Sequence, residues 1–379
     1  MSIVAKTAAM FQPRTSRRKI GPIGIDFGLE AVHLVQLAES DGKSPELRAA
    51  TSVPYNSSRR EVLENAHQFR SLLKRALAAD RFYGRKSVIA VPSGMFRTIS
   101  INYQSSGGKD QEGAAILRVM KDRLDGELSD YVIDYLPVNN RSKSDERLAL
   151  VAVSEHDRIV NFLELARKAR LDVDALEIGP VAISRLVGAL SQETGSSNVL
   201  VINSGRRASY LTVISGTDLL FDQEVSFGED SLIQQAAETL DLSNEMARDL
   251  ILRSGVASAA YDESVAVAID EAGLMSTISE ILKPQFIKLV EEIKRVCLYA
   301  ASETRGGAVT QVYLLGSIAR WPGSDALLST MTGVEVVKMS DPLAPFQLSD
   351  QRGTSPENSS SADLVVATGV ALRGMQSNG

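Results

Sequence analysis

Runs of apolar residues separated by short polar breaks dominate the early part of the chain. The segment Ile20–Leu37 is apolar on both sides of an Asp26-Phe27-Gly28 break, where glycine lets the backbone turn tightly between two strands. A second break at residues 40–43 precedes another apolar stretch, Leu47–Val53. The pattern therefore predicts three consecutive strands joined by tight turns.

The same pattern returns in the second half of the chain, over Asn198–Phe227. Three pairs of residues are separated by one constant interval: Asp26 and Asn203, Gly28 and Gly205, and Leu34 and Leu211. A duplicated hairpin predicts two similar domains that face each other. Two glycine turns that present an acidic and an amide side chain to one cleft are suited to gripping the phosphates of a nucleotide. The alternative is two unrelated hairpins with glycine turns.

The remainder of the first half predicts an α/β domain with a small module inserted in it. A helix at Glu61–Ala79 and a short buried strand at Ser87–Val91 continue the first domain. Between about residues 87 and 175 the expected elements are strands at 96–103, 131–138, 147–153 and 173–178 and helices at 111–124 and 155–169. This mixture indicates an α+β insert. The glycine-rich stretch 105–108 lacks the following Lys-Ser/Thr of a P-loop, so we do not assign it to phosphate binding.

The second half is expected to be more helical after its hairpin. A helical subdomain is predicted at about 228–305, ending in a long helix at 276–303, in which Pro284 marks a boundary or a kink. A buried strand ends at Gly316-Ser317, residues 349–361 have a disordered composition, and 364–374 form a final helix of small residues. We place the first domain at 20–197 and the second at 198–379, with the final helix a candidate to pack back on the first.

Composition narrows the class of protein. The net charge of −6 and pI of about 5.4 argue against a nucleic-acid-binding polyelectrolyte. The single cysteine excludes an internal disulfide, and the three scattered histidines offer no zinc spacing. No apolar run approaches the roughly 18 residues of a membrane span. The basic leader 1–19 is expected to be a disordered terminus, with weak attachment to an anionic membrane as the alternative.

The order of these features resembles the actin-like ATPase superfamily over about residues 20–374. Within it, the chain is most similar to the PilM family of type IV pilus assembly proteins and more distantly to the FtsA family. The most similar pieces are the segment 148–180 and the closing Ala-Thr-Gly-Val-Ala-Leu-Arg-Gly at 367–374. The resemblance implies two actin-like (ribonuclease H-like) domains around a central cleft, with an α+β insert in the first domain.

The resemblance also implies a site for ATP and Mg²⁺ in the cleft. The positions that match the superfamily's nucleotide-binding turns are Asp26, Gly28, His33, Asn203, Gly205, Arg206, Gly316 and Ser317. Asp26 corresponds to the residue that would help hold the metal ion. Elsewhere, Arg248 and Ile251 stand where the superfamily offers Glu-x-x-Lys to the nucleoside.

Several of these positions depart from the superfamily's chemistry. Glu30 follows the first turn and would repel phosphate if it faced the site, while His33 stands at the cation position. Asn203 keeps an oxygen but lacks the charge that helps hold hydrated Mg²⁺, although Arg206 or Arg207 could pair with phosphate. Each hydrogen-bond donor or charge that the nucleotide loses weakens its binding by about 1–3 kcal/mol. Because about 1.4 kcal/mol corresponds to a tenfold loss of affinity, we expect nucleotide binding to be weak or lost.

The function implied by the resemblance is that of an adaptor at the cytoplasmic face of the inner membrane. It would bind the short cytoplasmic tail of a PilN-like single-span protein in a pilus or type II secretion platform. The expected groove lies between Ser87–Arg97 and Leu171–Pro180, with Arg97 and Asp174 at its borders. The alternatives are an active Mg-dependent ATPase of the same fold and, third, an FtsA-like filament tether, for which the chain's end offers no amphipathic helix.

Overall fold

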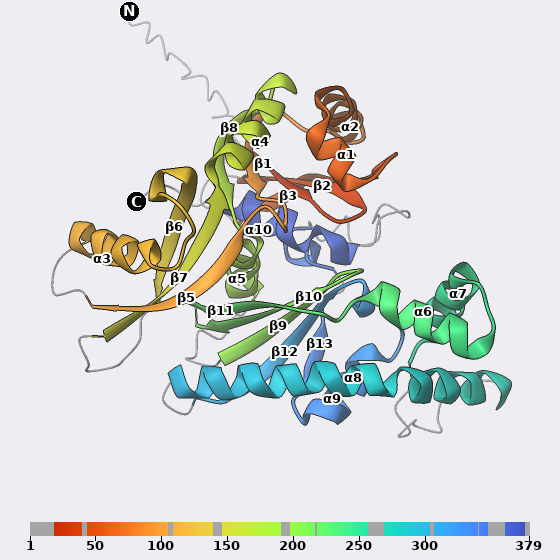
Figure 1. Ribbon diagram of the computed structural model, residues 1–379. Coiled ribbons are helices and arrows are strands. Elements are labelled where there is room, and N and C mark those ends of the chain that lie inside the picture. Colours follow the sequence, from red (N-terminus) through yellow and green to blue (C-terminus); the bar gives the residue numbers. More distant parts are fainter. Residues whose placement is uncertain are drawn as a thin grey trace, which may run out of the picture.

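The computed structural model describes most of the chain in two halves built on matching sheets (Figure 1). The described residues are 19–39, 44–104, 109–138, 146–190, 198–216, 218–256, 269–303, 307–339, 341–347 and 361–375. The sequence expectations that lie outside them concern the leader up to residue 18, the break at 40–43, the glycine-rich stretch 105–108 and residues 349–360 of the segment with a disordered composition.

The first sheet has five strands in the order β3-β2-β1-β4-β8. They are β1 (Lys19–Phe27), β2 (Ala31–Glu39), β3 (Glu46–Pro54), β4 (Lys86–Ala90) and β8 (Asp172–Glu177). The first three strands, β1 to β3, pair antiparallel in chain order. By contrast, β4 is parallel to β1, and β8 is parallel to β4. The predicted N-terminal three-strand unit is therefore the antiparallel half of a mixed sheet.

The second sheet repeats this order as β11-β10-β9-β12-β13. Its strands are β9 (Asn198–Ser204), β10 (Ser209–Ser215), β11 (Asp218–Val225), β12 (Val309–Gly316) and β13 (Val336–Lys338). Again the hairpin strands are antiparallel and the two later strands are parallel to the first. The two sheets share one topology, which confirms the predicted fold of two similar α/β domains.

The insert forms a separate three-stranded sheet in the order β5-β7-β6. It comprises β5 (Arg97–Gln104), β6 (Tyr131–Val138) and β7 (Glu146–Glu155), with α3 (Lys109–Lys121) and a 3₁₀ turn η1 (Leu128–Asp130). The helix expected at 155–169 is α4 (His156–Lys168), whose Phe162 and Ala166 pack into the core of the first domain, and the strand expected at 173–178 is β8 of the first sheet. Ile101, Ile116 and Val151 share a core between α3 and this sheet. The insert also contacts β11 of the second sheet, where the Thr98 hydroxyl donates to the Asp222 carbonyl at 3.3 Å.

The helix predicted at Glu61–Ala79 is two helices, α1 (Arg59–Glu64) and α2 (Ala66–Ala78). Asn65 divides them because it has extended backbone angles and its side chain accepts from the N–H groups of His67 and Gln68. This arrangement is a helix N-cap, which satisfies N–H groups that a new helix leaves unpaired. The single-helix prediction was wrong because periodicity continued across the cap.

The long helix α8 runs unbroken over Ile269–Glu303, so the expected boundary at Pro284 was wrong. Pro284 is exposed, while buried Leu282, Phe286 and Leu289 on either side pack into the core of the second domain. Burial of that stripe holds the helix together across the one missing hydrogen bond. The other elements of this half are α6 (Glu229–Leu240), α7 (Asn244–Ser254), η2 (Ile318–Arg320), α9 (Ser324–Thr332) and η3 (Ala344–Phe346).

The last helix, α10 (Val365–Arg373), follows the short turn η5 (Ser361–Leu364) and lies against β1, β2, β4 and α5 (Gly179–Leu190) of the first half (Figure 1). Its small residues allow this approach. A Cβ added to Gly369 would lie 2.1 Å from the carbonyl oxygen of Ala182, and one on Gly24 would lie 2.3 Å from that of Ala367. Within the described parts of the chain, no helix combines the length and apolarity needed to cross a bilayer.

Candidate functional site

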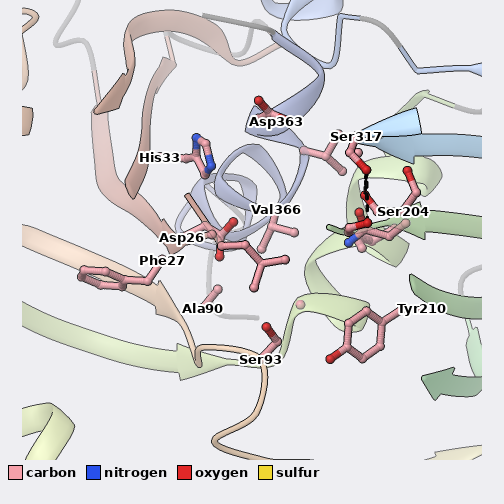
Figure 2. A pocket seen from close by; sticks show the side chains of 18 of the residues that line it. Asp26, Phe27, His33, Ala90, Ser93, Ser204, Tyr210, Ser317, Asp363 and Val366 are labelled. Atoms are coloured by element: carbon pink, nitrogen blue, oxygen red, sulfur yellow. Dashed lines mark hydrogen bonds between the residues drawn. The ribbon is translucent and has the colours of Figure 1, made fainter. Parts of the chain in front are cut away.

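A cavity of about 420 Å³ lies between the two sheets and is lined from both of them. The eight residues matched to nucleotide-binding turns all line it: Asp26, Gly28, His33, Asn203, Gly205, Arg206, Gly316 and Ser317. Figure 2 shows Asp26 and His33 on one side and Ser204 and Ser317 on the other. Arg97 and Asp174 do not line the cavity; each is exposed, and Asp174 forms an ion pair with Lys86 at 3.1 Å.

The first turn presents a neutral histidine where a cation was expected. His33 is only 6% exposed, and its Nδ1 lies 2.9 Å from the Ser52 hydroxyl. Burial lowers the pKa of His33 below its ordinary value, against the opposing field of Asp26, so the ring is uncharged at neutral pH. It cannot therefore replace an ammonium as a partner of phosphate.

Asp26 is the next-to-last residue of β1 and points into the cavity (Figure 2). Burial raises the pKa of Asp26, although His33 and Arg59 act in the opposite direction. A carboxyl group that resists ionisation is a poorer ligand for a hard divalent cation. In the described segments, no cluster of three His, Cys, Asp or Glu side chains is arranged to hold a metal ion.

The backbone of the first turn is packed against its own domain. A Cβ on Gly28 would lie 2.7 Å from Nε2 of His33, so glycine is required for this close approach. The Tyr55 hydroxyl donates to the Gly28 carbonyl at 2.8 Å, and the Tyr55 N–H donates to the Glu30 carbonyl at 2.9 Å. These contacts fix the direction in which Leu29 and Glu30 leave the turn.

The second turn is bonded to the start of α6. The N–H groups of Glu229 and Asp230 donate to the carbonyls of Gly205 and Arg206 at 3.1 and 2.8 Å. The N-terminal N–H groups of a helix are a ready site for phosphate. Here two of them are used by the turn itself.

The third turn lines the cavity, but its polar groups are bonded to the second turn. Gly316 has φ +81° and approaches so closely that a Cβ would lie 2.1 Å from the Ser204 carbonyl oxygen. The Ser317 hydroxyl lies 3.2 Å from the carbonyl oxygens of Ser204 and Gly205, to which it can donate (Figure 2). The Ser204 hydroxyl in turn donates to the Leu315 carbonyl at 2.8 Å. The polar groups expected to meet an adenosine are used within the protein.

Charges at the mouth of the cleft are paired with one another. Arg206 Nη1 lies 2.5 Å from a Glu30 carboxylate oxygen, and Nη2 lies 2.8 Å from Asp230. Partial burial lowers the pKa of Arg206, but Glu30 and Asp230 outweigh this and raise it overall. The possibility that Arg206 offsets lost phosphate contacts is thus opposed by two carboxylates already bound to it.

The helix position expected to meet the nucleoside is also occupied by internal contacts. Glu229 is fully buried and lies 3.7 Å from both Arg248 and Arg320, and Trp321 Nε1 donates to it at 3.2 Å. Ile251 belongs to the core of the second domain. Arg248 therefore pairs with a buried carboxylate, and Ile251 offers the cavity nothing.

Sequence reasoning missed several residues of the cavity, including Tyr210, Asp222, Arg320 and Asp363. Asp222 is 8% exposed and accepts a hydrogen bond from Thr212 at 2.7 Å. Its signal was an acid directly after the apolar run Leu219–Phe221 of β11. Tyr210 pairs with Asn203 in the β9–β10 hairpin and Arg320 closely follows Ser317, so both lay beside predicted positions. Asp363 had no local signal, because only the packing of distant segments brings it to the cleft.

Residues 24–375 match the family model described as type IV pilus assembly protein PilM. The chain belongs to this family. Comparison with curated proteins gives no match.

Solved structures support the fold of this PilM-family chain. A PilM–PilN type IV pilus biogenesis complex matches 94% of this chain and 99% of its own with a TM-score of 0.72 at 20% identity. The MamK double helical filament matches the same shares with a TM-score of 0.50 at 8% identity. The ethanolamine utilization protein EutJ from Carboxydothermus hydrogenoformans, at 15% identity, covers 93% of this chain and 89% of its own with a TM-score of 0.48. At these identities, the likeness to the PilM–PilN complex and to MamK establishes the actin-like fold alone.

The side chains of this cleft do not fit the Mg–ATP that the fold implies. Asp26 resists ionisation, His33 is neutral and Asn203 carries no charge. Glu30 adds a negative charge at the mouth and occupies Arg206. A polyphosphate that used Arg206 in this conformation would have to displace the Glu30 carboxylate from it, so we derive no chemical step through ATP.

Proposed function

We propose that this chain is an adaptor of a type IV pilus or type II secretion assembly platform that works without a requirement for ATP. Membership of the PilM family supports the assembly role. The likeness to the protein in a PilM–PilN complex supports a PilN-like inner-membrane partner, whose cytoplasmic tail would hold this chain at the membrane. The observation that carries independence from ATP is the Glu30–Arg206 ion pair across the cleft.

The groove proposed for the partner's tail lies where the chain enters and leaves the insert. Arg97 begins β5 at the entry, and Asp174 lies on β8, the edge strand of the first sheet. Both side chains are exposed, and Lys86 beside Asp174 adds a further charge. An extended tail could therefore combine pairing at a strand edge with charged contacts on both sides.

Reversing the charges at these borders is expected to weaken binding of the tail by at least about tenfold, because like charges would replace two favourable contacts. The variants are Arg97→Glu and Asp174→Lys, and the measurement is titration calorimetry with a synthetic N-terminal peptide of a PilN-like protein. Arg253→Glu and Asp249→Lys, exposed on α7 of the other domain, are matched controls. Affinities equal to those of the controls would contradict this placement of the groove.

An active ATPase remains the second candidate because the cleft holds a cavity of about 420 Å³ with Asp26 pointing into it. If the proposed scaffold role is correct, purified protein and its Asp26→Ala variant should hydrolyse ATP at the same background rate with Mg²⁺. The measurement is phosphate release at millimolar ATP. A Mg²⁺-dependent rate that Asp26→Ala abolishes would favour the enzyme.

A further inference from the structure

The hairpin turns of the two domains touch each other across the cleft. Cδ1 of Leu29 lies 3.2 Å from the place that a Cβ on Gly205 would occupy. Beside this contact, Glu30 reaches across to Arg206 at 2.5 Å. An apolar contact and an ion pair thus meet between the two turns that correspond to phosphate-binding turns.

Arg206 is held on two sides by carboxylates of different domains. Its Nη1 contacts Glu30 of the first domain, while Nε and Nη2 contact Asp230 of the second at 2.9 and 2.8 Å. A planar guanidinium binds two oxygens of one anion in the same way, whether carboxylate or phosphate. The side chains of Glu30 and Arg206 are 44% and 37% exposed, so the pair lies at the mouth of the cleft and not in its floor.

A second charged contact joins the two halves nearby. Arg320, which follows the third turn, lies 3.7 Å from Asp363. Asp363 precedes α10, which packs on the first sheet and α5. The two pairs connect the domains at separate points of the same cavity, since Glu30, Arg206, Arg320 and Asp363 all line it.

We propose that Glu30 serves as an internal anion that occupies Arg206 in place of a nucleotide phosphate and so holds the two domains together across the cleft. This inference rests on the ATP-independent function proposed above and names the residue that replaces the ligand. It follows that the cleft rejects polyphosphates for two reasons: its cation is already paired, and a carboxylate stands where the phosphate would go. Because the pair is partly exposed, raised salt should weaken it.

Neutralising Glu30 is expected to create an anion site. We would titrate inorganic pyrophosphate into wild type, Glu30→Gln and Glu30→Gln/Arg206→Gln by calorimetry at low salt without metal. Glu30→Gln should bind pyrophosphate at least about tenfold more tightly than wild type, and the second substitution should remove the gain. Glu64→Gln, an exposed member of an ion pair with Arg60, is the matched control and should behave as wild type. Equal affinities of wild type and Glu30→Gln, whether both tight or both absent, would overturn the proposal.

Hydrogen exchange tests the contact itself in the full chain. Peptides covering residues 26–33 and 203–208 should exchange faster in Glu30→Gln than in wild type, and pyrophosphate should slow them again in that variant. Unchanged exchange would show that Glu30 does not hold the turns together. We would also titrate the PilN-like peptide into the same variants. If the peptide binds but Glu30→Gln neither gains pyrophosphate binding nor exchanges faster, the role of Glu30 is wrong and the adaptor role stands. If Glu30→Gln shows both effects but the peptide does not bind, the adaptor role is wrong and the role of Glu30 stands.

Discussion

Replacing Glu177 by alanine is expected to lower the free energy of unfolding by about 3–5 kcal/mol, the usual loss when one member of a buried ion pair is removed. Only 4% of the Glu177 side chain is exposed, and its two oxygens accept from Arg185 at 2.6 Å each. Arg373 of α10 adds a third contact at 3.1 Å. The substitution would leave Arg185, itself 15% exposed, without its carboxylate in a poorly solvated place.

This cluster matters because it joins the end of the chain to the first domain. Glu177 ends β8, Arg185 lies on α5 and also donates to the Gly369 carbonyl at 3.0 Å, and Arg373 ends α10. Losing Glu177 should therefore loosen α10 first. We would measure urea unfolding by far-UV circular dichroism together with hydrogen exchange of residues 365–373.

Two further variants separate this effect from a general loss of charge. Glu64→Ala breaks an exposed pair with Arg60 and should cost no more than about 1 kcal/mol. Glu177→Leu/Arg185→Met replaces the buried pair by apolar groups of similar size and should recover much of the loss. A Glu177→Ala loss as small as that of Glu64→Ala would show that the buried pair contributes little.

The duplicated architecture could be predicted because it depends on local patterning repeated at a constant interval. Strand alternation and the glycine breaks at Gly28 and Gly205 are visible in the residues themselves, and the two sheets share one order of strands. Errors arose where a local signal competed with packing. Asn65 interrupts a continuous apolar period by capping a new helix, whereas Pro284 fails to interrupt α8 because its neighbours are buried.

The sequence predicted some of the residues that line the cleft, but not their charges or their ion pairs. Asp26, His33 and Asn203 were found by position, yet the neutral state of His33 follows from burial that only the folded chain shows. The pairing of Glu30 with Arg206 joins residues from two domains and has no local signature. Glu30 was expected to repel a phosphate; in the structure it binds the arginine that could have attracted one.

Asp222→Asn is expected to remove a pH dependence of stability on the order of 3 kcal/mol between pH 5 and 8. Burial raises the pKa of Asp222 to about 7, although hydrogen bonds from Thr212 and Thr98 act in the opposite direction. In the unfolded chain this carboxyl would titrate near 4. Between these values the folded protein binds the proton and the unfolded chain does not, so the wild type's free energy of unfolding must fall as pH rises toward 7 and level off above it.

Asp222 lies at a junction between domains, so its ionisation affects the contact between them. It lies on β11 where the insert meets the second domain, and Ser93 and Tyr210 line the same cavity beside it. Ionisation above pH 7 would place a charge at that junction with no cationic side chain paired to it among the described residues, so the asparagine variant should be the more stable protein at pH 8. We would compare urea unfolding of wild type, Asp222→Asn and Asp249→Asn, the last an exposed carboxylate on α7, at half-unit steps of pH. The difference in free energy of unfolding between wild type and Asp222→Asn should change with pH, whereas the difference between wild type and Asp249→Asn should stay nearly constant. Parallel curves of this free energy against pH for all three proteins would mean that Asp222 is charged in the native state throughout this range.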